Sequence, residues 1–437
     1  MITKVKSQEE ILKKLGIQKL NNMQLLAIES VKSHDDIVLL SPTGTGKTIA
    51  FLLPLIALLE ENIDGIQALI LVPSRELAIQ IEQVVREMGS GFKTNAIYGG
   101  RAGSKDKIEL KHAPSILIGT PGRVADHIRR ENINVENVKT LILDEFDKSL
   151  EVGFEKEMSE IIGGLTNLKK RILTSATQKA GIPEFVGVKK PKQINFLNEK
   201  ESNLKLQIVA NETGNKMDAL ECLLGKINDG NGIIFCNLKE TIDALSAFLT
   251  KKNIEHGCFY GGLDQKDREH SLIKFRNGTY KILLATDLAA RGIDVPAMNF
   301  IIHFQLPYKA EEFTHRNGRT ARMHNDGNAY ILKGNLDKMP YYVDDLEEIQ
   351  MNSKKKITAS FWKTLYISGG RKDKISKGDI AGLFFKQGGL KKEELGTIEL
   401  KQDCSYVAVP AKKMNDLVAL LNNNRLKKKK VRINCLS

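Results

Sequence analysis

Short apolar runs alternate with longer amphipathic stretches along the first part of the chain. The amphipathic stretches repeat apolar residues at helical spacing, and each apolar run has the length of a strand. Such short, fully apolar strands are typical of a parallel sheet that is covered by helices on both faces. The pattern predicts an α/β domain over residues 1–200, with strands at 37–40, 68–72, 94–97, 115–118, 140–143 and 171–174.

The same alternation resumes after a polar stretch at 197–203, which we expect to be a linker. It predicts a second α/β domain over residues 204–350, with strands at 232–236, 255–260, 281–285, 300–304 and 328–332. This second domain has no glycine-rich phosphate loop. Two sheets with one nucleotide site suggest a nucleotide that is clamped between the two domains.

A polar, lysine-rich stretch at 347–359 predicts a second linker. Beyond it, the order strand, helix, strand, strand, helix, strand is typical of a small RRM-like α+β domain. We expect this domain over residues 360–437, with strands at 364–368, 396–400, 405–409 and 430–434 and helices at 377–387 and 412–422.

A glycine-rich loop between the first strand and the next helix carries the first candidate chemistry. A strand, a loop ending in Gly-Lys-Thr and a helix form the setting of a P-loop, in which backbone N–H groups and the helix N-terminus bind phosphate. Lys47 would reach the β- and γ-phosphates and Thr48 would bind Mg²⁺. The predicted ATP-binding residues of this loop are Ser41, Thr43, Gly44, Thr45, Gly46, Lys47 and Thr48.

An acidic element follows the apolar run at 138–143. Carboxylates at the carboxyl end of a parallel strand lie beside the crevice in which open α/β sheets bind ligands. Asp144 is thereby placed to hold Mg²⁺ through its hydration shell, and Glu145 to orient and deprotonate an attacking water. Asp147 could instead cap the next helix.

The positive charge of the chain is concentrated at its end. Residues 354–437 contain 20 Lys and Arg and 7 Asp and Glu, a balance equal to the net charge of +13 of the whole chain. A basic domain attached to a neutral ATPase predicts a polyanionic partner, and nucleic acid fits best.

The remaining composition predicts a cytoplasmic enzyme that does not contact a membrane. No apolar run approaches the roughly 20 residues that span a bilayer, and the first residues lack the apolar core of a signal peptide. The five cysteines include no C-x-x-C pair, so neither a disulfide framework nor a zinc site is indicated.

The order of the short motifs resembles the DEAD-box family of RNA helicases, and the resemblance covers nearly the whole chain. The matching segments are Gln24, the P-loop, 73–77, 99–100, 120–123, the acidic box 144–147, 175–177, 285–287, 290–294 and 315–322. The resemblance implies two tandem RecA-like domains and an RNA-stimulated ATPase that uses ATP and Mg²⁺.

The resemblance also implies roles for single residues. Gln24 would read adenine and Asp294 would contribute to ATP binding. Arg319 and Arg322, three apart on a predicted helix, would act on the γ-phosphate once the two domains close. Contacts to the RNA backbone are implied for Arg75, Gly100, Thr120, Arg123 and Thr286, and coupling of ATP to RNA for Asp147, Ser175, Thr177 and His315.

Several positions depart from the family pattern, and three of them predict a change in function. Phe146 replaces an alanine, which predicts bulk beside Glu145 and looser coupling of hydrolysis to RNA. Asn21 stands where the family usually has threonine, and Ile17 where an aromatic residue commonly packs on adenine. These two changes predict relaxed adenine selectivity.

The final domain resembles the RNA-binding domain of DbpA-type helicases at 366–374, 378–382, 396–398 and 405–410. In that family the domain grips a hairpin of large-subunit ribosomal RNA, which implies binding through Arg371, Lys372 and Lys374. Tyr366 and Tyr406 are candidates for stacking on bases, and equally for packing within the small sheet.

The sequence therefore predicts a monomeric ATP-dependent RNA helicase. It would hydrolyse ATP to ADP and phosphate while it locally unwinds structured RNA during assembly of the large ribosomal subunit. Two alternatives are an RNA-binding clamp or chaperone with a weak ATPase, and a DNA-directed helicase. RNA-stimulated ATPase activity distinguishes the first, and comparison of RNA with DNA stimulation distinguishes the second.

Overall fold

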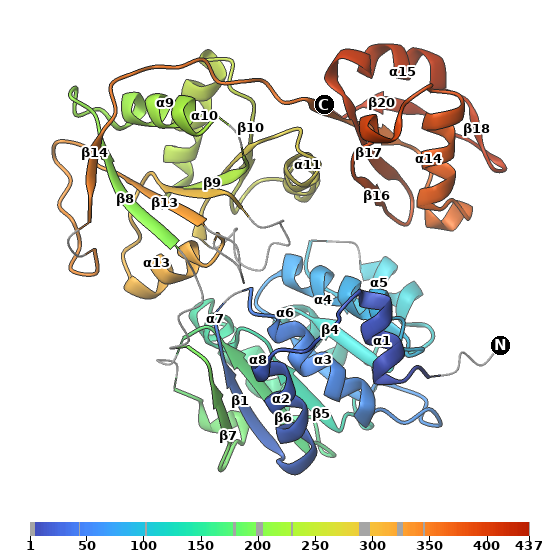
Figure 1. Cartoon of the computed structure of the whole chain (residues 1–437). Coiled ribbons are helices and arrows are strands. Elements are labelled where there is room, and N and C mark those ends of the chain that lie inside the picture. The colour runs from blue at the N-terminus through green and yellow to red at the C-terminus, as the bar shows by residue number, and fades with distance from the viewer. Residues whose placement is uncertain are drawn as a thin grey trace. The chain divides into compact units, whose positions relative to one another are not determined.

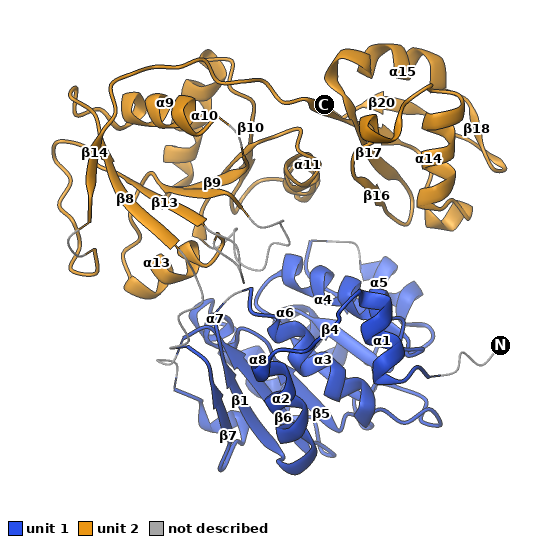
Figure 2. Cartoon of the chain, viewed as in Figure 1, with its two compact units in different colours: residues 1–201, 291–294 blue, residues 202–290, 295–437 orange. Residues whose placement is uncertain are grey.

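The computed structural model describes residues 5–42, 44–100, 103–177, 181–197, 204–228, 230–287, 298–320, 327–343 and 346–436. The described residues fall into two compact units (Figure 2). Unit 1 comprises those up to 197, and unit 2 comprises those from 204 onward. Within unit 2 we call residues 204–351 the second core domain and residues 362–436 the tail domain.

Unit 1 is built on a seven-stranded parallel sheet in the order β3-β4-β2-β5-β6-β1-β7 (Figure 1). Its strands are β1 (Asp36–Leu40), β2 (Ala68–Leu71), β3 (Thr94–Ile97), β4 (Ile116–Gly119), β5 (Thr140–Leu143), β6 (Lys170–Ser175) and β7 (Lys192–Asn195). Its helices are α1 (Gln8–Leu15), α2 (Asn22–Ser33), α3 (Lys47–Leu58), α4 (Arg75–Met88), α5 (Gly103–Leu110), α6 (Pro121–Arg129), α7 (Phe146–Glu151), α8 (Glu155–Gly163) and the 3₁₀ helix η1 (Glu184–Val186).

Successive apolar residues of the inner strands of unit 1 enter two different cores. In β1, Ile37 and Leu39 pack with residues of α1 to α4, whereas Val38 and Leu40 pack with residues of α6, α7 and α8. Since successive strand residues point to opposite faces, both faces of the sheet are buried. The expected parallel α/β architecture is therefore confirmed.

The second core domain repeats this plan with a seven-stranded parallel sheet in the order β10-β11-β9-β12-β13-β8-β14. Its strands are β8 (Leu204–Ala210), β9 (Gly232–Phe235), β10 (His256–Phe259), β11 (Ile282–Ala285), β12 (Phe300–His303), β13 (Gly327–Leu332) and β14 (Glu348–Gln350). The helices among its described residues are α9 (Lys216–Ile227), α10 (Lys239–Lys251), α11 (Gln265–Arg276) and α13 (Ala310–Asn317).

The tail domain has an antiparallel sheet in the order β16-β17-β15-β20, as the predicted RRM-like layout requires. Its strands are β15 (Trp362–Ile367), β16 (Ile398–Leu400), β17 (Ser405–Pro410) and β20 (Ile433–Cys435), and β18 (Arg425–Leu426) and β19 (Lys429–Lys430) form a separate hairpin. Its helices are α14 (Lys377–Lys386), α15 (Met414–Leu421) and the 3₁₀ turns η2 (Arg371–Asp373), η3 (Lys392–Glu394) and η4 (Ala411–Lys413).

The second predicted linker needs correction. Residues 348–350 form β14, which pairs with β8 at the edge of the second core sheet, so this part of 347–359 is sheet. Its three residues alternate between exposed and half-buried, and their polar composition hid the strand. The first predicted linker lies almost entirely outside the described residues. Among the described residues, no helix is long and apolar enough to cross a membrane.

Candidate nucleotide site and RNA-contacting residues

The P-loop of unit 1 follows β1 and ends where α3 begins at Lys47. The buried Lys47 side chain donates from Nζ to the carbonyl oxygens of Ser41 (2.5 Å) and Pro42 (2.8 Å). Gly44 and Gly46 adopt φ values of 84° and 88°, which favour glycine. The loop thus has the backbone geometry that its sequence predicts, with Thr43 outside the described residues.

Gln24 is fastened to the same loop. It forms a reciprocal capping box with Asn21 at the start of α2, through bonds of 2.9 and 3.0 Å. Gln24 Nε2 also donates to the carbonyl of Gly46 (3.3 Å), and Asn21 Nδ2 to that of Thr45 (3.0 Å). A Cβ atom at position 46 would lie 2.6 Å from Gln24 Nε2, so this glycine is needed for close approach as well. Asn21 therefore supplies a working helix cap in place of the family's usual threonine.

Asp144 and Glu145 lie at the carboxyl end of β5, next to β6. The hydroxyl group of Thr174 on β6 donates to Asp144 Oδ1, and the backbone N–H of Glu145 donates to Thr174 Oγ1 (3.3 Å). Burial, with the nearby charge of Glu145, raises the pKa of Asp144 to about 6. A pair of buried carboxyl groups at this edge favours a bound cation.

The backbone at Glu145 is in the left-handed region, with φ 50°. Such conformations are uncommon for residues with a Cβ atom and cluster at functional sites. Phe146 begins α7 directly after this turn and lies in the core with 2% of its surface exposed. The Phe146 side chain packs in the core on this face of the sheet, and looser coupling of hydrolysis to RNA stays a prediction.

Three of the predicted coupling residues form one hydrogen-bonded group. Thr177 Oγ1 donates to Asp147 Oδ2 (3.1 Å), and the Thr177 backbone N–H donates to Ser175 Oγ (2.9 Å). Burial raises the pKa of Asp147. Asp147 lies inside the first turn of α7, whose N-cap is Glu145 without a side-chain cap bond, so Asp147 binds the loop after β6 rather than capping the helix.

The residues of unit 1 to which RNA contacts were assigned lie at the ends of β2, β3 and β4. Arg75 starts α4 and packs against Gly100, where an added Cβ atom would lie 2.2 Å from Arg75 Nη1. Arg123 donates from Nε to the fully buried Asp106 (2.7 Å), which also lies 3.0 Å from His127 Nε2. Thr120 directly precedes α6. These side chains are therefore held at the same edge of the sheet as the P-loop.

The predicted residues of the second core domain follow β11 and α13. Thr286 and Asp287 follow β11, and His315 lies on α13. Helix α13 ends at Asn317, so Arg319 lies in the following turn with 7% of its surface exposed. The prediction that Arg319 shares a helical face with Arg322 is wrong as regards Arg319. Arg322 and Asp294 lie outside the described residues.

Arg316 organises this edge and was missed by the sequence reasoning. Its guanidinium group, 1% exposed, donates to Asp287 Oδ1 (2.6 Å), to the Gln305 carbonyl (2.5 Å) and to Asn237 Oδ1 (2.8 Å). Burial, together with the Arg316 charge, lowers the pKa of His303 to about 3. The signal for the cluster was a polar residue two positions after the last residue of each apolar strand, as at Asn237, Gln305 and Asp287.

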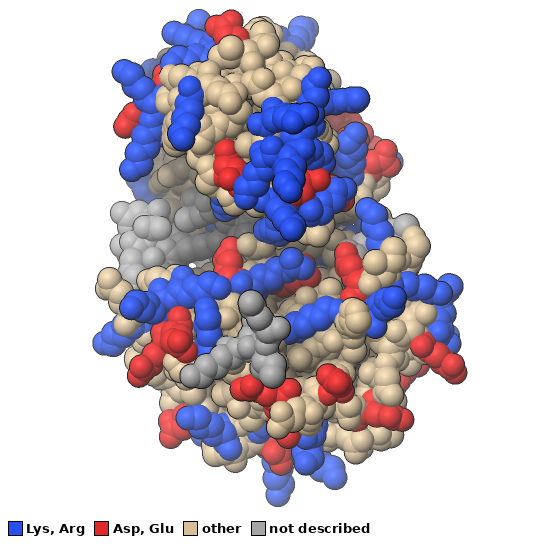
Figure 3. All heavy atoms as spheres, turned by 90° about the vertical axis from the view of Figure 1, so that its right-hand side faces the viewer, with Lys and Arg blue, Asp and Glu red and all other residues tan. Residues whose placement is uncertain are grey.

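The predicted RNA-binding residues of the tail domain are all exposed. Arg371 and Lys372 lie in η2, and Lys374 follows it with φ 59°. Lys372 pairs with Asp403 (2.5 Å), and the neighbouring Lys427 and Lys429 reach Asp379 and Asp373. Lys and Arg side chains gather on the tail domain in the upper part of the view in Figure 3.

Comparison with known proteins assigns the chain to a family. Residues 21–185 match the DEAD/DEAH box helicase family, residues 215–324 the helicase conserved C-terminal domain, and residues 364–434 the DbpA RNA binding domain. The chain is 30% identical to the ATP-dependent RNA helicase DbpA of Bacillus subtilis, over 96% of this chain and 95% of the relative. The chain belongs to the DEAD-box family of ATP-dependent RNA helicases. It is an RNA-stimulated ATPase with a DbpA-type tail.

Two further matches support the same assignment for this DEAD-box helicase. DbpA of Escherichia coli is 29% identical over 97% of this chain and 96% of its own length. Yeast Dbp5 bound to RNA and ADP-BeF3 superposes with a TM-score of 0.68 at 26% identity, covering 78% of this chain and 93% of Dbp5.

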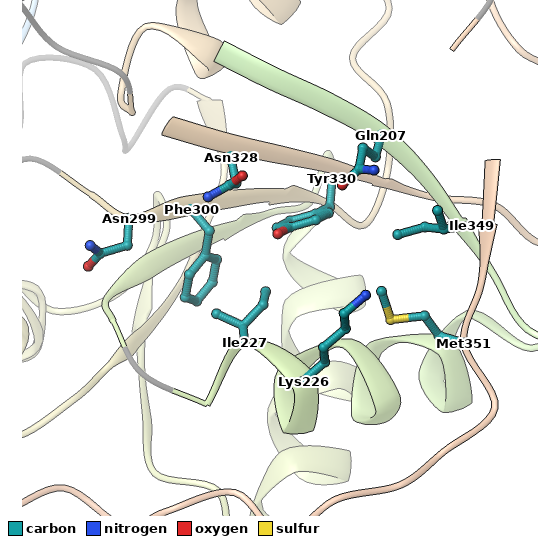
Figure 4. Close-up of a pocket in the computed structure, with 9 residues that line it drawn as sticks. All are labelled: Gln207, Lys226, Ile227, Asn299, Phe300, Asn328, Tyr330, Ile349 and Met351. Atoms are coloured by element: carbon teal, nitrogen blue, oxygen red, sulfur yellow. The ribbon is translucent and has the colours of Figure 1, made fainter. Parts of the chain in front are cut away.

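The second core domain of the helicase also has a pocket of about 380 Å³, which lies apart from all the motifs. It is lined by strand residues such as Phe300 and Tyr330 and by Lys226 at the end of α9 (Figure 4). None of the predicted site residues lines it.

We expect Glu145→Gln to abolish turnover without loss of binding. Glutamine keeps the size of the side chain but cannot accept the proton of the attacking water, so ATP hydrolysis should fall by on the order of 10²-fold or more. The measurement is RNA-stimulated phosphate release, with ATP and RNA binding measured separately. Glu155→Gln, at an exposed position of α8, is the matched control. Near-normal turnover in Glu145→Gln would remove Glu145 from this role.

Phe146→Ala would restore the family's alanine, but we expect it to destabilise unit 1. Removing a buried aromatic side chain costs about 3–5 kcal/mol when the core cannot collapse around the cavity. Denaturant unfolding of the full chain measures this loss. Val152→Ala, at a position with 38% exposure, should change stability by less than about 0.5 kcal/mol. Equal stability of Phe146→Ala and the parent chain would contradict the packing described here.

Arg316→Ala should destabilise the second core domain. It leaves Asp287 without its buried cationic partner, and breaking such a pair costs about 3–5 kcal/mol. Arg316→Lys keeps the charge but loses the fork of donors, so we expect an intermediate loss. Thermal unfolding is the measurement, and Lys252→Ala, which removes a partly exposed ion pair with Glu221, is the control. An Arg316→Ala chain as stable as this control would exclude a structural role.

Proposed function

We propose that this helicase acts on structured RNA of the large ribosomal subunit during ribosome assembly, in the cytoplasm and as a monomer. The observation that carries the proposal is the tail domain. It combines an RRM-like sheet and a match to the DbpA RNA binding domain, and together with the lysines at 354–356 that lead into it, it carries the whole excess positive charge of the chain. A tail of this kind would bring a general RNA helicase core to one structured RNA.

The ATP site would work through the residues of the P-loop and the acidic box. Lys47 binds carbonyl oxygens of its own loop, contacts that β- and γ-phosphate oxygens can replace. Glu145 would orient a water molecule in line with the γ-phosphate and accept its proton. The water oxygen then bonds to the γ-phosphorus as the bond to the ADP oxygen breaks.

Mg²⁺ fits the donors of this site. No group of three or more acidic, histidine or cysteine side chains that could hold a metal occurs among the described residues. A nucleotide-bound Mg²⁺ needs only one or two protein oxygen ligands, because phosphates and water supply the rest. Asp144 and Thr48 would hold it, and the buried Asp144 carboxyl favours a cation. The ion would neutralise charge on the phosphates.

Crosslinking in cells tests the RNA target. Ultraviolet crosslinking of the tagged full-length chain, followed by sequencing, should enrich one region of large-subunit ribosomal RNA over all other RNA. Reads spread over messenger RNA in proportion to abundance would overturn the proposed target while leaving the helicase assignment intact.

Replacing Arg371, Lys372 and Lys374 by Ala should remove the preference for one structured RNA over a generic duplex. Each lost phosphate contact lowers the slope of log K against log salt by about 0.7–0.9, so three contacts should flatten it by up to about 2–3. RNA-stimulated hydrolysis at saturating generic duplex should survive, because the nucleotide motifs are untouched. Filter binding over a range of salt concentrations measures both effects.

The matched control for this triple variant removes three other lysines of the tail domain. Lys386, Lys391 and Lys392 are exposed and give the same change of charge when replaced by Ala. If the two triple variants lose equal affinity and both keep the RNA preference, the effect is one of net charge and the assigned residues do not read the RNA.

A further inference from the structure

The pocket of the second core domain lies on the face of the sheet that helix α9 covers. Helix α9 ends at Ile227, and the pocket of about 380 Å³ opens beside this residue, near the starts of β12 and β13. Residues that face a covering helix in a parallel sheet are normally apolar. Asn328 and Tyr330 of β13 share this face, since alternate strand residues point the same way, and both are half-buried. The sheet therefore presents an amide and a hydroxyl group where helix packing alone favours apolar side chains.

Apolar side chains form the walls of the pocket. The rings of Phe300 on β12 and Tyr330 on β13 point from the sheet toward Ile227 (Figure 4). Ile349 and Met351, in and directly after β14, line the pocket farther along the sheet. Aromatic side chains in the wall of a pocket favour flat ring systems, which pack on them with a large contact area. The walls therefore suit a planar ligand.

Three polar groups of the pocket are available to such a ligand. Lys226 carries the only charge among the described residues that line the pocket, and its amine is directed toward the sheet (Figure 4). Within the part of the chain that the structure describes, neither this amine nor the side-chain amide of Asn328 nor the Tyr330 hydroxyl group has a hydrogen bond or ion pair with protein. Gln207, by contrast, already donates to Glu347 (2.6 Å). One positive charge beside two neutral polar groups favours a negatively charged ligand.

We propose that this pocket binds a small planar organic anion, with its ring against Phe300 and Tyr330 and its anionic group at Lys226. Small-molecule sites typically enclose about 300–1,000 Å³, so a volume of 380 Å³ suits a molecule of one or two rings. The pocket lies near the amino ends of β12 and β13, whereas Asp287 and Arg316 lie beyond the carboxyl ends of β11 and β12. It is therefore separate from the residues assigned to ATP and RNA. The inference does not depend on the ribosomal target proposed above.

Binding of three matched naphthalene probes to the full-length chain tests the pocket. Naphthoate is the planar anion, naphthamide is its neutral counterpart and naphthylmethylamine is the cation. Saturating ADP and Mg²⁺ occupy the P-loop, so that an anionic probe cannot bind there. Titrations followed by saturation-transfer NMR of each probe give its dissociation constant.

We expect naphthoate to bind the parent chain about tenfold more tightly than naphthamide, the ratio that one charge-assisted hydrogen bond implies. Lys226→Glu should reverse the preference, so that naphthylmethylamine binds more tightly than naphthoate. Tyr330→Leu should weaken all three probes by roughly three- to tenfold, because the contact between the rings is lost. Tyr330→Phe keeps the ring and should lose less.

Lys251→Glu is the matched control, because it makes the same change of charge at an exposed position of α10, a helix that contacts β10 and β11. It should leave the order of the probes unchanged. Lys226 is exposed, so its replacement should leave the fold intact, and thermal unfolding checks this. Equal binding of naphthoate and naphthamide by the parent chain, no detectable binding of any probe, or an order that Lys226→Glu does not change would overturn the proposed site.

Discussion

The nucleotide site depends on three neighbouring parallel strands that end at one edge of the first sheet. Strand β6 lies between β5 and β1, and its register pairs Leu40 with Ser175 and Leu143 with Leu173. The segments that follow these strands are therefore neighbours although they are far apart in sequence. This edge is also where Asp144 and Asp147 are buried, with a raised pKa in each case. Thr174 and Thr177 on and after β6 supply the hydrogen bonds that make this burial tolerable.

The second core domain uses the same strand order for a different purpose. At the corresponding edge, Arg316 is held by a carboxylate, a backbone carbonyl and an amide. An arginine that is buried and bound in this way is a fixed part of the fold. Burial, and after it the charge of Arg316, lowers the pKa of the neighbouring His303. Lys47 of unit 1 instead donates to two carbonyl oxygens of its own glycine-rich loop. Phosphate oxygens can replace these two carbonyl oxygens as acceptors. The two sheets thus share an architecture, but Lys47 of the first can bind a ligand whereas Arg316 of the second is bound within the fold.

In the tail domain, the sheet face that was expected to stack on RNA bases is covered by protein. An RRM-like sheet offers an open face with aromatic residues, and the tail domain has Tyr366 and Tyr406 there. On this face Tyr406 packs against Ile273, and Glu399 pairs with Arg276 of the same chain. Basic residues away from this face, among them those at η2 and near the β18–β19 hairpin, are exposed.

The amino-acid sequence by itself determined most of the elements, the two α/β domains and the RRM-like tail, and it indicated the residues of the candidate nucleotide site. These features can be recognised within short segments of the sequence. They are the periodicity of the strands, the glycines at 44 and 46 and the charged residues after β1 and β5. Strands β7, β8 and β14 were missed because they are partly polar at the sheet margin, where neighbouring strands decide the pairing. Only the tertiary structure decided that Phe146 enters the core, that Arg316 binds Asp287 and that Tyr406 meets α11. These contacts join residues that are distant in sequence or depend on one backbone turn, so no spacing pattern records them.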